Sequence, residues 1–122
     1  MAHILLIDDM KNVRRAAASV LKAAGHRVSE AGDGGEGIAL IKGGQRFDLV
    51  ITDMLMPEQD GADVIMFLET LPARPPVLAI SGGGSNVPAD VALMLAKVKA
   101  DAVLAKPFDN SDLIATVDRL LG

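Results

Sequence analysis

Residues 49–53 read Leu-Val-Ile-Thr-Asp and form the most strand-like stretch of the sequence. The run is apolar and β-branched before it ends in an acid, which is typical of a strand buried on both faces. Such strands belong to parallel sheets that helices cover on either side. The stretch therefore predicts the central strand of an α/β protein, with Asp53 at its carboxyl end.

Short apolar runs alternate with helix-period segments on both sides of this strand, a pattern typical of a parallel sheet with crossover helices. The other strands are predicted at residues 4–7, 27–31, 77–80 and 102–105. Five helices are predicted: around 13–24, around 38–41, through 64–68, from near 88, and after a cap at Asp109 or Ser111. We therefore expect one doubly wound domain with five strands and five helices over residues 1–122.

Composition excludes several classes of function. The 122 residues carry a formal net charge of −4, so no basic field is available to hold nucleic acid. The absence of Cys excludes disulfides and thiolate metal sites. No signal-peptide pattern opens the chain, and no apolar run approaches the ~20 residues of a membrane helix. We expect a cytoplasmic protein without direct contact to membrane or nucleic acid.

Residues with chemically useful side chains follow four of the predicted strands. They are Asp8 and Asp9 after the first strand, Asp53 after the third, Ser81 after the fourth and Lys106 after the fifth. The carboxyl ends of parallel strands share one edge of the sheet, where ligands of open α/β sheets bind. A single acid at a strand end is usually a helix cap or turn residue. The whole set at one edge instead predicts one site.

Three crowded carboxylates repel one another, and either raised pKa values or a bound divalent cation relieves the repulsion. Oxygen ligands favour Mg²⁺, which is commonly held by one or two carboxylates together with phosphate oxygens. Asp53 would then attack phosphorus as a carboxylate nucleophile and form an acyl phosphate. The Lys106 ammonium and the Ser81 hydroxyl would stabilise charge on the phosphoryl oxygens.

The same residues resemble, over the whole chain, the receiver domains of two-component response regulators. The matching motifs are Asp8-Asp9, Asp53 with Met56-Pro57 and Asp60-Gly61, Ser81-Gly82, and Lys106-Pro107-Phe108. The resemblance implies a flavodoxin-like sheet with the strand order 2-1-3-4-5. It also implies a phosphohistidine donor on a sensor histidine kinase or a histidine phosphotransfer protein.

Roles for individual residues follow from this resemblance. Asp9 and Asp53 would ligate Mg²⁺ directly, Asp8 would do so mainly through water, and Leu55 would contribute its backbone carbonyl. Ser81 and Lys106 would contact the phosphoryl group on Asp53. Many family members carry a switching Tyr or Phe where this chain has Val103, so ring rotation is not expected to transmit its signal.

We therefore expect a signalling switch that changes its affinity for a partner, not a conventional turnover enzyme. A receiver-like interaction module that is never phosphorylated needs none of the residues Asp9, Asp53, Ser81 and Lys106. An aspartate-nucleophile phosphohydrolase of the haloacid-dehalogenase type needs an acid two residues after the nucleophile, where Leu55 stands. The position of Met1 immediately before the first strand favours a stand-alone protein over a domain of a larger chain.

Overall fold

The computed structural model describes residues 1–54, 61–81, 100–105 and 108–122, and the structural statements below concern these residues. Its strands are β1 (His3–Ile7), β2 (Arg27–Ala31), β3 (Leu49–Asp53), β4 (Val77–Ser81) and β5 (Ala102–Ala105). All pair in parallel, in the order β2-β1-β3-β4-β5. The predicted doubly wound sheet, its order and the central place of residues 49–53 are confirmed.

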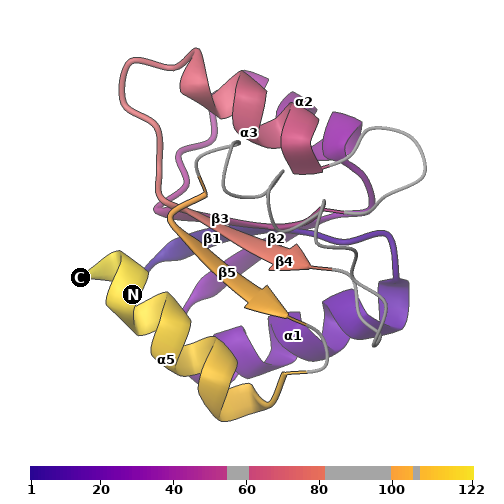
Figure 1. The fold of residues 1–122 in the computed structure, drawn as a ribbon, viewed down its shortest axis with the longest axis vertical. Helices are drawn as coiled ribbons and strands as arrows, with labels where there is room; N and C mark the ends of the chain where they lie inside the picture. The colour runs from indigo at the N-terminus through magenta and orange to yellow at the C-terminus, as the bar shows by residue number, and fades with distance from the viewer. Residues whose placement is uncertain (55–60, 82–99, 106–107) are drawn as a thin grey trace.

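The helices that the described residues form are α1 (Lys11–Ala23), α2 (Gly34–Lys42), α3 (Gly61–Glu69) and α5 (Asn110–Leu121). The helix predicted from near residue 88 lies outside the described residues. Figure 1 shows α1 and α5 on one face of the sheet and α2 and α3 on the other. This arrangement is the covering on both faces that the continuous apolarity of β3 requires.

Strand side chains alternate between two hydrophobic clusters, one on each face of the sheet. On the α1 and α5 face, Ile4 and Ile51 pack with Leu21 and Leu113. On the α2 and α3 face, the neighbouring strand residues pack with helix residues in a second cluster: Leu5, Ile7, Val50, Val64, Ile65 and Leu68. Every residue of β3 is buried. Side-chain packing on both faces of the sheet therefore fixes the backbone that leads to Asp53.

Helix α2 is longer than the four residues predicted for it, and two features explain the difference. The Asp33 side chain accepts a hydrogen bond from the Glu36 N–H at 2.7 Å and caps the helix. Gly37 is buried, and a Cβ at this position would overlap the Ile7 side chain. The glycines that weakened the helical pattern therefore include one that allows α2 to lie close to β1.

Helix α5 begins as the sequence predicts. The Asp109 carboxylate accepts hydrogen bonds from the Asp112 N–H at 2.9 Å and from the Ser111 hydroxyl at 2.7 Å, so Asp109 is the cap. Leu113 and Val117 are buried, whereas Leu120 and Leu121 are only partly buried. Helix α3 runs from Gly61 to Glu69 and contains the residues 64–68 that the sequence predicts as helical.

Two acids at the amino edge of the sheet cap strand N–H groups. Asp48 accepts from the His3 N–H at 2.8 Å, and Asp101 accepts from the Val77 N–H at the same distance. Asp101 also accepts a hydrogen bond from the Arg74 guanidinium at 2.9 Å. Burial raises the pKa of Asp101, but the hydrogen bonds from Arg74 and Val77 and the guanidinium charge outweigh it and hold the pKa below its usual value.

The depressed pKa makes the stability contribution of Asp101 dependent on pH. Folding favours the carboxylate, so the contribution is complete above the unfolded-state pKa of about 3.9 and is lost as pH falls through the lower folded-state pKa. We predict that Asp101→Asn lowers the free energy of unfolding at neutral pH by about 1 kcal/mol, because its hydrogen bonds are partly screened by solvent. Urea unfolding from about pH 6 to about pH 3 should show this deficit shrinking.

The matched control is Asp118→Asn, which removes one exposed carboxylate from α5. Its free-energy difference from wild type should stay small over the same pH range. A deficit in Asp101→Asn that does not change on acidification would show that the carboxylate charge contributes nothing to the fold.

Candidate functional site

Three of the predicted site residues come together at the carboxyl edge of the sheet. Asp8 and Asp9 follow β1, and Asp53 is the last residue of β3. One carboxylate oxygen from each lies within 4.8 Å of the others. Because β1 and β3 are neighbouring parallel strands, with Ile7 paired to Thr52, their next residues meet at the same level of the edge.

The backbone around these acids is held in place by the sheet. The Asp8 N–H donates to the Ala31 carbonyl of β2 at 3.1 Å, and the Met54 N–H donates to the Ile80 carbonyl of β4 at 3.0 Å. The Asp8 carboxylate accepts a hydrogen bond from the Met10 N–H at 2.9 Å, which closes a tight turn before α1. The backbone hydrogen bonds between the strands therefore continue up to Asp8 and Met54. They fix the backbone from which the acidic side chains extend.

Two of the three carboxylates are almost completely removed from solvent. Asp53 is 3% exposed and Asp8 is 5% exposed, whereas Asp9 is exposed. Like charges this close and this poorly hydrated oppose one another, and a cation among them removes the penalty.

The donor set fits Mg²⁺. All three ligands that the cluster offers are carboxylate oxygens, which hard divalent cations prefer over nitrogen or sulfur. Mg²⁺ retains several waters in most protein sites, and the exposed Asp9 leaves the cluster open to solvent. The arrangement can hold a cation beside a carboxylate that ends the central strand.

The remaining predicted residues are only partly within the described structure. Ser81 is the last residue of β4 and pairs with Ala105 of β5, so its backbone lies at the same edge of the sheet. Leu55 and Lys106 lie outside the described residues, directly after Met54 and Ala105 in the chain. Val103 lies on the edge strand β5 with 48% of its surface exposed.

The sequence pattern did not indicate one residue that contacts the acidic turn. Arg14 of α1 donates a hydrogen bond from Nη1 to the Asp8 carbonyl oxygen at 2.9 Å and one from Nε to Glu30 of β2 at 3.1 Å. Helical periodicity places Arg14 off the apolar stripe of α1, which by itself indicates no contact with the turn. Its partner Glu30 is 16 residues away, so no local motif links the two.

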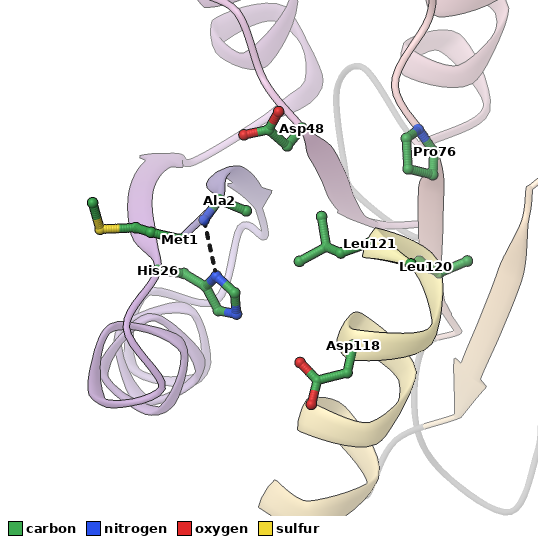
Figure 2. A pocket seen from close by; sticks show the side chains of 9 residues that line it. Met1, Ala2, His26, Asp48, Pro76, Asp118, Leu120 and Leu121 are labelled. Carbon is green, nitrogen blue, oxygen red and sulfur yellow. Dashed lines mark hydrogen bonds between the residues drawn. The ribbon is translucent and has the colours of Figure 1, made fainter.

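One groove lies away from the acids. It has a volume of about 640 Å³ and is lined by residues that precede strands and by the end of α5, most of which Figure 2 labels: Met1, Ala2, His26, Asp48, Pro76, Asp118, Leu120, Leu121 and Gly122. Within it the Ala2 N–H donates to His26 Nδ1 at 3.2 Å. Residues before and after parallel strands lie at opposite edges, so this groove is separate from the acids.

A five-stranded parallel sheet with an acidic cluster at its carboxyl edge defines an open α/β domain, a class of protein in which ligands bind at that edge. Among known protein families, the response regulator receiver domain matches residues 4–118 of the chain. The chain belongs to the response regulator receiver domain family of two-component systems. The resemblance that the motifs indicated is confirmed, and the phosphohydrolase alternative is not favoured.

Two curated relatives illustrate the family. The gliding motility regulatory protein of Myxococcus xanthus is 36% identical over 121 residues, which cover 97% of this chain and 15% of that protein. The transcriptional regulatory protein CpxR of Klebsiella pneumoniae is 31% identical, with 99% of this chain and 50% of that protein covered. The chain thus spans half the length or less of these relatives.

Solved structures agree with the fold. The receiver domain of the Francisella response regulator 1452 superposes with a TM-score of 0.86 at 26% identity, covering 99% of this chain and 97% of that one. The chemotaxis protein CheY4 of Vibrio cholerae gives a TM-score of 0.85 at 28% identity, with 98% of each chain covered. Within the described ranges, no helix is long and apolar enough to cross a membrane.

The repulsion among the acids predicts how stability responds to Mg²⁺. A Mg²⁺ ion that binds the folded cluster and not the unfolded chain should, at ten times its Kd, stabilise the fold by about 1.4 kcal/mol. Asp9→Asn removes a repelling charge and a predicted ligand together. We predict that this variant melts above wild type in EDTA and gains little from Mg²⁺, as measured by thermal unfolding at constant ionic strength.

Asp118→Asn again serves as the matched control, because it removes one exposed charge far along α5. It should keep the full Mg²⁺-dependent rise in Tm. A less stable Asp9→Asn in EDTA, or an undiminished Mg²⁺ response in it, would exclude Asp9 from the metal site.

Proposed function

We propose that the chain is a phosphorylation switch in which Asp53 accepts a phosphoryl group in a Mg²⁺-dependent reaction. The observation that supports this most strongly is the cluster of three carboxylate oxygens within 4.8 Å at the end of the central strand, in a chain of the receiver family. Residues 1–122 would act as one receiver unit. Its output would be a change in affinity for a downstream protein.

The chemistry assigned to Asp53 is a group transfer. One Asp53 carboxylate oxygen attacks phosphorus, a P–O bond forms, and the P–N bond of a phosphohistidine donor breaks. The imidazole nitrogen leaves with the bonding electron pair and takes up a proton from solvent. The β1 and β4 ladders on either side hold the Asp53 backbone in place for this attack.

Asp8, Asp9, Asp53 and the backbone carbonyl of Leu55 are the proposed Mg²⁺ ligands. When bound, Mg²⁺ would neutralise the cluster and balance negative charge on the phosphoryl oxygens. For the residues within the described structure, the support is the chemistry and closeness of their carboxylates. For Leu55 the support is its place in the sequence, two residues after Asp53.

Ser81 and Lys106 are proposed to contact the phosphoryl group, through a hydroxyl and an ammonium respectively. Ser81 is the last residue of β4, and Lys106 follows β5 in the chain. The carboxyl ends of both strands lie at the edge that carries the acids. A positive partner at that point would stabilise the charge that develops on the equatorial oxygens. The donor is proposed to be a sensor histidine kinase or a histidine phosphotransfer protein, and the setting the cytoplasm.

The rival function, a receiver-shaped module that is never phosphorylated, fits the site less well. A scaffold would gain nothing from two carboxylates that are 3% and 5% exposed beside a third, because their repulsion lowers stability. Residues that reduce stability without a structural benefit are typical of functional sites. The acids are therefore better explained by cation and phosphoryl chemistry.

The phosphoacceptor assignment is tested with a small phosphodonor. Incubation with acetyl phosphate and Mg²⁺ should add one phosphoryl group, seen by intact-mass spectrometry, and hydroxylamine should remove it because the product is an acyl phosphate. Asp53→Asn should remain unlabelled. Asp112→Asn, which changes an exposed acid on α5, should be labelled as wild type is.

Labelling that persists in Asp53→Asn would assign the phosphoryl group to another residue. Labelling that resists hydroxylamine would show that the modified group is not a carboxylate. Equal labelling in EDTA would remove Mg²⁺ from the reaction.

A further inference from the structure

Arg14 connects the acidic turn to a second strand. Its Nη1 donates to the Asp8 carbonyl oxygen at 2.9 Å, and its Nε donates to Glu30 Oε1 at 3.1 Å. The Arg14 side chain is 15% exposed and the Glu30 side chain 26%, so the pair is largely shielded from solvent. Glu30 pairs with Leu6 in the β1–β2 ladder, which fixes the position of the anion that orients the guanidinium.

The turn that Arg14 contacts is short. Asp8, Asp9 and Met10 are the only residues between the end of β1 and the start of α1. Three hydrogen bonds hold Asp8. Its N–H donates to the Ala31 carbonyl of β2, its carboxylate accepts from the Met10 N–H, and its carbonyl accepts from Arg14. Arg14 therefore restrains the Asp8 carbonyl, while the sheet restrains the N–H and the turn restrains the carboxylate.

The guanidinium also lies close to the turn after β2. A Cβ on Gly32 would lie 3.5 Å from Arg14 Nη1 and 3.5 Å from a Glu36 carboxylate oxygen, and the Gly32 N–H donates to that same oxygen. Arg14 thus bonds to the turn after β1 and lies near the turn after β2. The contact favours Arg over Lys, because a planar guanidinium donates in two fixed directions and an ammonium cannot match both.

We propose that Arg14 is a positioning residue for the cation site: through the Asp8 carbonyl it fixes the turn that presents Asp8 and Asp9 to Mg²⁺. The inference rests on the proposed function in so far as Mg²⁺ binds at these acids. Groups that hold metal ligands in place without touching the metal affect its affinity strongly. Arg14 has this role although it carries the same sign of charge as the cation.

That sign of charge makes the experiment decisive. If the guanidinium acted only as a nearby positive charge, Arg14→Gln would strengthen Mg²⁺ binding, because a repelling charge is removed. A positioning role requires the opposite. We expect Arg14→Gln and the charge-conserving Arg14→Lys each to raise the Kd for Mg²⁺ about tenfold, measured by calorimetry at constant ionic strength on variants shown to be folded.

Arg74 supplies a matched control at the other edge of the sheet. Its guanidinium also donates to a backbone carbonyl, that of Pro75 at 3.0 Å, and to a carboxylate, that of Asp101 at 2.9 Å. Arg74→Gln should lower Tm to an extent similar to Arg14→Gln and leave the Kd for Mg²⁺ unchanged. A Kd that rises in Arg14→Gln and not in Arg74→Gln requires a role in positioning the acids, because loss of a nearby positive charge alone would lower the Kd.

Tighter Mg²⁺ binding by Arg14→Gln, or a wild-type Kd in both Arg14 variants with only Tm reduced, would overturn the inference. If wild type binds Mg²⁺ but Asp53 forms no acyl phosphate, the proposed function fails and the role of Arg14 stands. If Asp53 is phosphorylated and the Arg14 variants bind Mg²⁺ as wild type does, the proposed function stands and the role of Arg14 fails. A wild type that binds no Mg²⁺ removes both.

Discussion

The structure depends on holding like charges together at the carboxyl edge of a parallel sheet. Asp8 follows β1 and Asp53 ends the neighbouring strand β3. Both residues are almost fully buried. Their repulsion opposes folding, and the continuous apolar strands β1 and β3 supply the opposing stability through burial on both faces. The acids therefore stand at the ends of two deeply buried strands, a placement that suits a site whose ligands must be fixed.

The two edges of the sheet use their acids differently. At the amino edge, Asp48 and Asp101 accept hydrogen bonds from strand N–H groups, and Arg74 compensates the charge of Asp101. At the carboxyl edge, Asp8, Asp9 and Asp53 converge on one another, and the cation that contacts their turn, Arg14, bonds to a carbonyl and to Glu30. Acids of the first kind stabilise the fold through their hydrogen bonds, whereas acids of the second kind gather carboxylates at one point, as functional sites do.

The strand pattern and the rule for parallel sheet edges were sufficient to predict the sheet and the meeting of the three acids, because both depend on chain order and buried apolar runs. Helix α2 was underestimated because Gly37 weakens helical propensity while serving a contact with Ile7 that only the folded structure reveals. Arg14 was missed for a related reason. Its partner Glu30 lies on another strand, and a pairing across 16 residues leaves no periodic signal.

We propose above that Asp8, Asp9 and Asp53 form one Mg²⁺ site at the carboxyl edge. A Mg²⁺ titration followed residue by residue through backbone amide NMR shifts tests it most directly. The account predicts that the amides of Asp9, Met10 and Met54 shift together with a single Kd, while those of Val77 and Asp101 at the amino edge stay still. Separate Kd values for the two turns, or shifts centred on the groove around His26 and Asp118, would contradict it.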